Sequence, residues 1–320
     1  MANKNIAASI ILCTYNREQL LPRMLDSLLM QTFQDYEIIL INNGSTDGTD
    51  RVCRQYAERD DRIRYYVLSE NHGAARARNF GLDHVSGRYV SMVDDDDYCM
   101  PDMFETLYAM TENYQADIAV VGCQYRYSDH IEDVYNYDEE YLLEGSDGLR
   151  AFLERKLYNT IPGTKLFAAK LFQGLRWVEN TKIDDIHFIY KLFVKAKRVV
   201  TCGKPLYQQY KHDGNMTSFL SGNKLTEEVL DDYLAMQDER VAYVSAQVPE
   251  LTALVGYSRV SYMISMVERI EKGDAVGCEK QLQYMKTYLK QHQNELLETP
   301  WATEREKNLM DKYILEEAAL

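Results

Sequence analysis

The stretch Arg88–Asp97, RYVSMVDDDD, decides the expected fold, because an apolar run of strand length ends directly in four aspartates. Segments with apolar residues at helical spacing separate this run from others like it. The other runs of strand length are Ala8–Cys13, Tyr36–Ile41, Arg62–Leu68 and Asp117–Gly122. Strands that alternate with helices predict an α/β fold, in which a mostly parallel sheet is flanked by helices.

The pattern changes after residue 124. Residues 124–145 are rich in tyrosine and acidic residues and are expected to form a loop or short antiparallel strands. Asp184–Lys195 is predicted as a helix, and two short strands are predicted at Val199–Cys202 and Leu206–Tyr210. Beyond residue 223 the chain is predicted to be helical. We therefore expect a first domain over residues 1–220 and a C-terminal helical region over residues 221–320.

The composition excludes several classes of function. The formal net charge is −14, which argues against capture of nucleic acid or of an anionic bilayer. No apolar run reaches the roughly 18 residues of a membrane-spanning helix, so no integral span is expected. The N-terminal apolar run turns into a polar loop, unlike a signal peptide, and the six cysteines include no CxxC pair. We therefore expect reduced cysteine thiols and a cytoplasmic protein. The protein would be either free in the cytoplasm or peripheral at the inner face of a membrane.

Three polar clusters follow predicted strands: Thr14–Arg17, Asn42–Asp47 and Asp94–Asp97. In open parallel sheets the ends of such strands meet at one edge, where ligands bind. The NNGS turn supplies backbone amides there, and the helix expected from Thr46 to Arg59, capped by Ser45 or Thr46, supplies its positive end. The alternative is a plain strand-to-helix turn.

The aspartate run indicates a metal site. Four adjacent carboxylates repel one another unless a cation joins them, and hard divalent ions prefer oxygen ligands and bridge to phosphate oxygens. The alternative is a solvated acidic loop, but the apolar segment directly before the run should be buried. Between the clusters, Arg76 and Arg78 lie on different sides of a predicted helix, so at most one of them faces the pocket. Its guanidinium can hold a pyrophosphate or pair with the aspartates.

Taken together, five segments resemble the family-2 glycosyltransferases of the GT-A fold, over residues 6–215. The segments are SIILCTYNR, QTFQDYEIILINNGSTDGT, NHGAARARNFGL, GRYVSMVDDDDYCMPD and KIDDIHFIYKLF. The resemblance implies an inverting enzyme that uses a nucleotide-diphosphate sugar with Mn²⁺ or Mg²⁺. It also implies a nucleotide-sugar half over residues 1–123 and an acceptor half over 124–220. The acceptor implied is a saccharide or glycoconjugate, lipid-linked ones included.

The resemblance assigns the donor site. Thr14 and Tyr15 match residues beside the nucleobase, and Arg17 and Arg78 join them as nucleotide-binding residues. Asn43 stands where the family usually has an aspartate that receives the uracil N3–H. Its side-chain oxygen can accept the same proton, so a UDP-sugar is expected.

The resemblance also places the aspartates. Asp94 is expected by the ribose and Asp96 on the metal, with Asp95 near the nucleotide, although Asp95 or Asp97 could shift this register by one. His212 is expected either as a further metal ligand or as an exposed loop histidine.

Asp185 matches the family's catalytic base. An inverting transfer needs a carboxylate that takes the proton from the acceptor hydroxyl as its oxygen attacks the anomeric carbon. Asp184 stands where glutamate is more usual, and either aspartate could instead be a helix N-cap. Trp177, just before this segment, is expected either to form a wall for a sugar or to pack in the core.

Two other classes of function are weighed against the transferase. A non-catalytic sugar-binding, nucleotide-binding or scaffolding protein could use the same domain, but the intact acidic run and Asp185 argue against it. A sugar nucleotidyltransferase would need a glycine-rich basic loop after the first strand, and CTYNREQL contains none. The C-terminal helices carry wide apolar stripes that must be buried, so they are expected to pack and to offer a face for a homodimer.

Overall fold

The computed structural model describes residues 6–181, 183–212, 225–273, 275 and 277–315. The chain divides into two compact units, Met1–Lys211 and His212–Leu320. The domain boundary that we expected at residue 220 lies outside the described residues.

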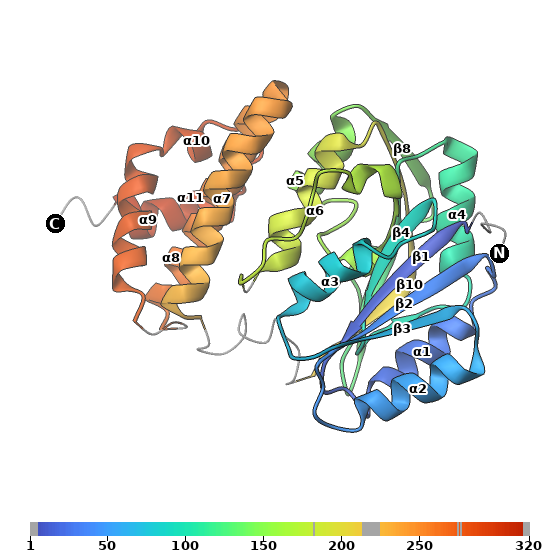
Figure 1. The fold of residues 1–320 in the computed structure, drawn as a ribbon. Helices are drawn as coiled ribbons and strands as arrows, with labels where there is room; N and C mark the ends of the chain where they lie inside the picture. Colours follow the sequence, from blue (N-terminus) through green and yellow to red (C-terminus); the bar gives the residue numbers. More distant parts are fainter. Residues whose placement is uncertain (1–5, 182, 213–224, 274, 276, 316–320) are drawn as a thin grey trace. The chain divides into compact units, whose positions relative to one another are not determined.

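A mixed sheet forms the centre of the first unit (Figure 1). Among the described residues its main path runs in the order β3-β2-β1-β4-β9-β6-β10-β5. In chain order, these strands are β1 (Ala8–Thr14), β2 (Tyr36–Asn43), β3 (Ile63–Leu68), β4 (Tyr89–Asp94), β5 (Tyr98–Cys99), β6 (Ile118–Arg126), β9 (Lys165–Ala168) and β10 (Arg198–Tyr210). Two short antiparallel strands lie off this path, where β7 (Ile131–Asp133) pairs with β6 and β8 (Glu140–Glu144) with β10. The short strands fall in the region where a loop or antiparallel strands were expected.

The strands β3, β2, β1 and β4 are parallel, as the alternation of strands and helices predicted. In their register Thr14 lies opposite Asn42, and Cys13 lies opposite Asp94. The polar clusters that follow these strands therefore meet at one edge of the sheet. The sequence pattern missed β9, an antiparallel strand of four residues between β4 and β6.

Helices cover both faces of the sheet. The helices α1 (Leu21–Leu29) and α2 (Thr49–Arg59) lie on one face and α3 (Ala74–Leu82) on the other (Figure 1). This arrangement follows from right-handed crossovers, because the chain reverses its direction across the sheet after β3. Three further helices complete the first unit: α4 (Met103–Tyr114), α5 (Asp147–Glu154) and α6 (Asp184–Lys195).

Two local predictions were wrong, each because of contacts made elsewhere in the chain. The helix expected from Thr46 begins at Thr49 and has no side-chain cap. Ser45 and Thr46, the expected caps of this helix, bind Asn16 instead. Ser45 Oγ accepts from Asn16 N at 3.0 Å, and Thr46 N donates to Asn16 Oδ1 at 2.8 Å. The two short strands expected near residues 199–210 are one strand, β10, whose register against β6 shifts around Pro205.

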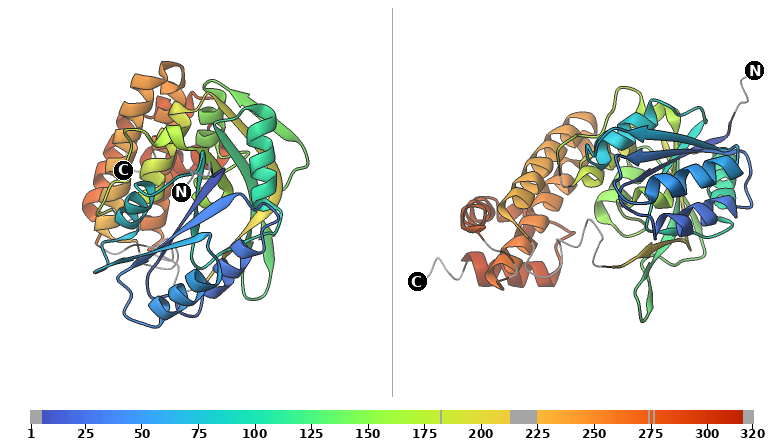
Figure 2. Two further views of the ribbon diagram at one scale, coloured as in Figure 1. Left: turned by 45° about the vertical axis from the view of Figure 1, so that its right-hand side comes forward. Right: turned by 60° about the horizontal axis from the view of Figure 1, so that its bottom comes forward.

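The second unit is helical. Its helices are α7 (Glu227–Gln247), α8 (Thr252–Glu271), α9 (Glu279–Gln291), α10 (Asn294–Leu297) and α11 (Glu304–Met310). The helix α8 packs against each of the others, and its buried side chains include Met263, Ile264 and Val267. Figure 2 shows the helices of this unit in orange and red. The apolar stripes are thus buried within the unit, as expected. No helix among the described residues is both long and apolar enough to cross a bilayer.

Candidate active site

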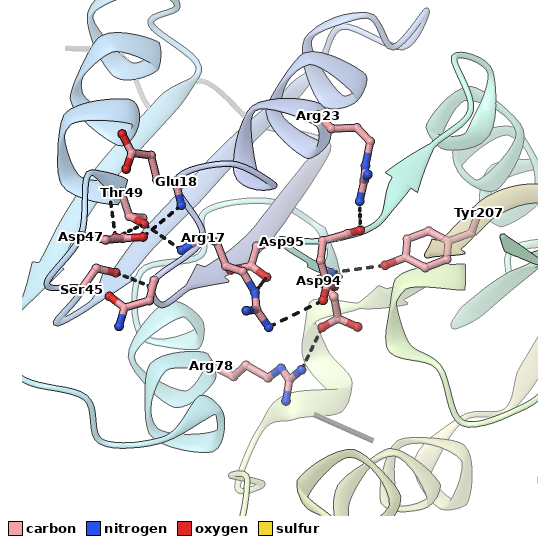
Figure 3. A network of polar contacts seen from close by, with 12 residues as sticks. Arg17, Glu18, Arg23, Ser45, Asp47, Thr49, Arg78, Asp94, Asp95 and Tyr207 are labelled. Atoms are coloured by element: carbon pink, nitrogen blue, oxygen red, sulfur yellow. Dashed lines mark hydrogen bonds and ion pairs between the residues drawn. The ribbon is translucent and has the colours of Figure 1, made fainter. Parts of the chain in front are cut away.

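The loop after β1 is fastened to the loop after β2 (Figure 3). Asn16 N donates to Ser45 Oγ at 3.0 Å, and Arg17 N donates to Thr49 Oγ1 at 2.8 Å. Thr14 is buried at the end of its strand, whereas the ring of Tyr15 is 39% exposed. The fastened loop therefore presents an aromatic ring and the Arg17 side chain at the carboxyl edge of the sheet.

Asn43 is buried and ties β2 to the loop before α3. Its side-chain nitrogen donates to Asn71 Oδ1 at 3.0 Å and to the Gly73 carbonyl at 3.1 Å. Its oxygen accepts from His72 N at 3.3 Å. The amide predicted to contact the nucleobase thus also holds the loop beside it. An aspartate at this position would place carboxylate oxygens against two acceptors, so the two side chains are not interchangeable here.

Asp94–Asp97, called the acidic loop below, ends β4. Asp97 turns into the protein, where Tyr207 Oη donates to Oδ2 at 2.6 Å and Tyr210 N donates to Oδ1 at 2.9 Å. Both oxygens of Asp97 are therefore engaged by β10. The side chain of Asp94, by contrast, is one-third exposed. This geometry favours the register that uses Asp94 and Asp96 over the one shifted by one residue.

Two arginines contact the acidic loop from α1 and the loop before it. Arg17 lies 3.5 Å from Asp95 Oδ1 and 3.8 Å from Asp96 Oδ2. Arg23, which the sequence did not single out, donates to the main-chain carbonyls of Asp96 and Asp97 and stacks on the Tyr210 ring, 3.5 Å from its centroid. Arg23 thus holds the loop backbone, whereas the charge of Arg17 faces carboxylates.

Arg78 is the centre of a buried ion network. Its guanidinium lies 3.1 Å from Asp94 Oδ1 and 3.1 Å from Asp185 Oδ1, and it also donates to Asp184. Its side chain is only 10% exposed, whereas Arg76 on the same helix is exposed, as the helical spacing predicted. Burial opposes the charge on Arg78, but the three carboxylates hold its pKa well above the usual value. Of the two roles expected for Arg78, the structure provides the pairing with aspartates.

Asp184 and Asp185 lie in the first turn of α6. The N-cap of this helix is Ile183, with no capping side-chain hydrogen bond, so neither aspartate is the helix cap. Asp184 is buried, and the side chain of Asp185 is 27% exposed. Asp185 therefore combines a contact with Arg78 with partial access from outside.

The carboxylates of the site lie in surroundings that disfavour their charge. Burial raises the pKa of Asp95 to about 7 and that of Asp185 to about 7, and it raises the pKa of Asp94 as well. Neighbouring carboxylates add to each increase, while the guanidinium of Arg78 opposes it at Asp94 and Asp185. A cation bound beside these carboxylates would favour their ionised forms, which is what a cation-binding site requires.

Two further residues from the sequence analysis differ in outcome. Trp177 is a core residue, because it is buried and its ring stacks on Phe188 with centroids 3.7 Å apart. His212 follows β10 and is half-buried, but it belongs to the second unit, so its relation to the acidic loop remains a prediction. Sequence patterns also gave no sign of Lys165, a fully buried lysine whose Nζ donates to the Ile161 carbonyl at 2.7 Å.

Residues 9–176 match the model of the family described as glycosyl transferase family 2. The chain belongs to this family. It is 34% identical over 218 residues to the glycosyltransferase GlyA of Streptococcus pneumoniae, a match that covers 65% of this chain and 31% of GlyA. The chain thus spans less than a third of that relative.

Solved structures share the fold of this family-2 chain. Residues 1–349 of Staphylococcus aureus TarS, in complex with UDP-GlcNAc, give a TM-score of 0.72 at 19% identity, covering 95% of this chain and 83% of that one. The mannosyltransferase PcManGT of Pyrobaculum calidifontis, in complex with GDP-Man and Mn²⁺, gives 0.55 at 16% identity, covering 98% and 86%. The expected GT-A fold is therefore confirmed.

The donor set of the acidic loop fits the divalent metal that the GT-A fold implies. Within the described part of the chain, no three His, Cys, Asp or Glu side chains are arranged to hold a metal by themselves. Mg²⁺ is commonly held through one or two carboxylates, with substrate phosphates and water as the other ligands. Partly buried carboxylates at the end of β4 match that mode, in which the substrate completes the site.

Proposed function

We propose that the protein is an inverting glycosyltransferase that moves a sugar from a nucleotide-diphosphate sugar, a UDP-sugar, to a hydroxyl of a saccharide or glycoconjugate. The observation that carries this proposal is the contact of one buried guanidinium, Arg78, with both Asp94 and Asp185. This contact places a carboxylate of α6 beside the acidic loop. The family membership supports the same reaction class.

Asp185 would act as the base. Its oxygen takes the proton of the acceptor hydroxyl while the hydroxyl oxygen forms a bond to the anomeric carbon and the bond to the diphosphate breaks. Attack from the face opposite the leaving group inverts the configuration. Burial raises the pKa of Asp185 to about 7, and the charge of Arg78 opposes a further increase. A base with a pKa near the operating pH is well matched to proton transfer.

Asp96 would hold Mn²⁺ or Mg²⁺, with Asp94 by the ribose and His212 as a further candidate ligand. The bound metal would offset negative charge that develops on the leaving diphosphate. The main chain of Asp96 is fixed by Arg23, so its carboxylate is presented from a held loop. Arg17 lies 3.5 Å from Asp95 Oδ1 and 3.8 Å from Asp96 Oδ2, and its side chain is 24% exposed, against 10% for that of Arg78. We therefore assign the diphosphate contact to Arg17 rather than to Arg78.

The nucleobase would lie at the carboxyl ends of β1 and β2. The exposed Tyr15 ring offers a stacking surface, with Thr14 and Asn43 at the neighbouring strand ends. Asp95 completes the nucleotide-binding residues. The complex of TarS with UDP-GlcNAc supports uracil as the base, and the complex of PcManGT with Mn²⁺ supports that metal.

The acceptor, the location and the assembly of the protein remain proposals of the same kind. Acceptor contacts would come from the half of the first unit that follows residue 123, for saccharides and lipid-linked glycoconjugates alike. We propose that the protein reacts with nucleotide sugars in the cytoplasm, and that it is located in the cytoplasm or at the inner face of a membrane. A homodimer would form through the C-terminal helices.

The test is a screen of UDP-Glc, UDP-GlcNAc, UDP-Gal and GDP-Man for nucleotide release and for transfer to saccharide acceptors in the presence of Mn²⁺. Three proteins are compared: the wild type, Asp185→Asn, and Asp83→Asn as a control at an exposed carboxylate. We expect turnover of a UDP-sugar by the wild type and the control, and unchanged UDP binding with turnover lowered about 10²–10⁴-fold by Asp185→Asn. Equal turnover by all three proteins would contradict the assignment of the base.

A further inference from the structure

Tyr207 of β10 connects the two ends of the acidic loop. Its side chain is fully buried, and its main chain lies between Cys99 of β5 and Cys123 of β6. The hydroxyl donates to Asp97 Oδ2 at 2.6 Å and accepts from Asp94 N at 3.3 Å (Figure 3 shows the second contact). One hydroxyl therefore holds the main chain where the loop begins and the side chain where it ends.

This double contact fixes the residues between the two ends. Asp97 N also donates to the Asp94 carbonyl at 3.4 Å, so the loop is a closed turn. The second oxygen of Asp97 accepts from Tyr210 N, three residues farther along β10. Asp97 is thus anchored at both oxygens to one strand. The orientation of Asp95 and Asp96 follows from these anchors, because both residues lie inside the turn.

The ring of Tyr207 is itself held on its other side. A Cβ atom placed on Gly163 would lie 2.5 Å from the ring Cζ and 2.7 Å from the hydroxyl oxygen, so only glycine allows this close approach. Lys165 fixes the 3-10 turn that contains Gly163. Its Nζ donates to Thr164 Oγ1 at 2.9 Å and to the Ile161 carbonyl. The hydroxyl therefore has a defined position before any ligand binds.

We propose that Tyr207 is a positioning residue for the donor site. Its hydroxyl sets the direction in which the acidic loop presents Asp94 and Asp96, and so determines the affinity for a metal-bound nucleoside diphosphate. This role rests on the function proposed above, and it adds a residue of β10 that touches neither donor nor acceptor. Loss of the hydroxyl removes this hydrogen bond from a buried oxygen of Asp97, and leaving a buried polar group without a partner is costly, so the effect should be measurable.

The experiment compares Tyr207→Phe with Tyr158→Phe. Tyr158 is an apt control, because it is 1% exposed and its hydroxyl donates to the Gly148 carbonyl at 2.7 Å, in the α5 region. Hydrogen–deuterium exchange follows the amides of residues 94–99, and calorimetry follows UDP binding with and without Mn²⁺. We expect Tyr207→Phe to exchange at least about tenfold faster in this segment and to bind UDP with Mn²⁺ about 10- to 100-fold more weakly. Tyr158→Phe should stay within about twofold of the wild type in both measurements.

Two further variants separate positioning from a general loss of packing. Gly163→Ala keeps the hydroxyl but displaces the ring, and it should reproduce the loosened loop even if Tyr207→Phe folds poorly. Asp97→Asn combined with Tyr207→Phe should weaken UDP binding by less than the product of the two single losses, because the contact between Tyr207 and Asp97 is common to both variants. Multiplicative losses in the double variant would overturn the proposal.

The decisive comparison does not depend on turnover. If residues 94–99 exchange in Tyr207→Phe as in the wild type, the hydroxyl does not hold the loop and the proposal is wrong. It is also wrong if the segment loosens while the affinity for UDP with Mn²⁺ stays within about twofold. If the wild type itself binds none of the nucleotides, the proposed function fails, and the exchange data still decide whether Tyr207 holds the loop.

Discussion

Arg78→Met removes the only cation that touches Asp94, Asp184 and Asp185 together among the described residues. The guanidinium lies 3.1 Å from the nearest oxygen of Asp94 and of Asp185, and its side chain is only 10% exposed. Methionine keeps most of the length of the side chain and its helix propensity, so the variant tests charge rather than volume. Arg76→Met on the same helix is the matched control, because Arg76 is exposed.

The expected loss of stability follows from the burial of the network. Removing one partner of a buried ion pair typically costs about 3–5 kcal/mol, because an uncompensated charge is left behind. Three carboxylates lose their cation here, so we expect a loss of this size for Arg78→Met at pH 8. An exposed arginine contributes within about 0.5 kcal/mol, which is the expectation for Arg76→Met.

The loss should depend on pH with a definite sign. Without Arg78, burial and mutual repulsion raise the pKa values of the carboxylates further above the unfolded value of about 3.9. A carboxyl group whose pKa is raised in the folded state binds its proton more tightly there than in the unfolded state. Its effect on the free energy of unfolding is therefore absent below the pKa of the unfolded state. The destabilisation grows as the pH rises from that value towards the pKa of the folded state. The difference between Arg78→Met and wild type should therefore be smallest near pH 4 and largest near pH 8.

Guanidinium chloride unfolding of the three proteins at pH 4, 6 and 8 measures these differences, with the fluorescence of Trp177 as a probe of the first unit once Trp301 of the second unit is replaced by Phe in all three. The Trp177 ring is buried there against Phe188 of α6, the helix that carries Asp184 and Asp185. The reasoning is refuted if Arg78→Met and Arg76→Met unfold at the same concentration at pH 8. It is refuted equally if the loss at Arg78 is independent of pH.

Three further predictions concern the proposed chemistry. Asp185→Asn should lower kcat by about 10²–10⁴-fold with UDP affinity unchanged, as steady-state kinetics and calorimetry will measure. For the wild type, kcat should fall about tenfold per pH unit below about 7, because the base with a pKa of about 7 becomes protonated. The residual kcat of Asp185→Asn should not show this decrease at low pH. Asn43→Asp should lower the free energy of unfolding by about 1–3 kcal/mol, because the new carboxylate faces Asn71 Oδ1 and the Gly73 carbonyl, and a thermal melt at neutral pH is the check.

The edge of the sheet could be predicted from the sequence because its determinants are local. The strands β1, β2 and β4 are apolar runs that end in polar residues, and parallel pairing brings those ends together at Thr14, Asn42 and Asp94. Asp184 and Asp185 at the start of a helix were also visible, because the apolar stripe of α6 follows them directly. In these cases the spacing of the apolar residues along the chain predicts the strand or the helix.

The contacts that complete the site could not be predicted, because they join residues far apart in the chain. Tyr207 and Asp97 are separated by 110 positions, and Arg78 and Asp184 by 106, with no local pattern that pairs them. A contact between residues far apart in the chain also explains why the helix begins at Thr49 and not at the predicted Thr46. Asn16, from the neighbouring loop, forms hydrogen bonds with Ser45 and Thr46. Which carboxylate of the acidic loop faces inward is thus a property of β10, not of the DDDD run.

The charges of the site explain why metal and donor should bind together. The carboxylates of Asp95 and Asp96 contact the guanidinium group of Arg17, and those of Asp94, Asp184 and Asp185 contact that of Arg78. A diphosphate that entered alone would add negative charge beside carboxylates whose pKa values are already raised. A divalent cation on Asp96 would remove that repulsion and free Arg17 for the diphosphate. Asp96→Asn should therefore abolish the gain in UDP affinity that Mn²⁺ provides, yet leave metal-free UDP binding unchanged or stronger. Calorimetry with and without Mn²⁺ separates the two effects, and a weaker metal-free affinity in Asp96→Asn would show that the carboxylate contacts the nucleotide directly.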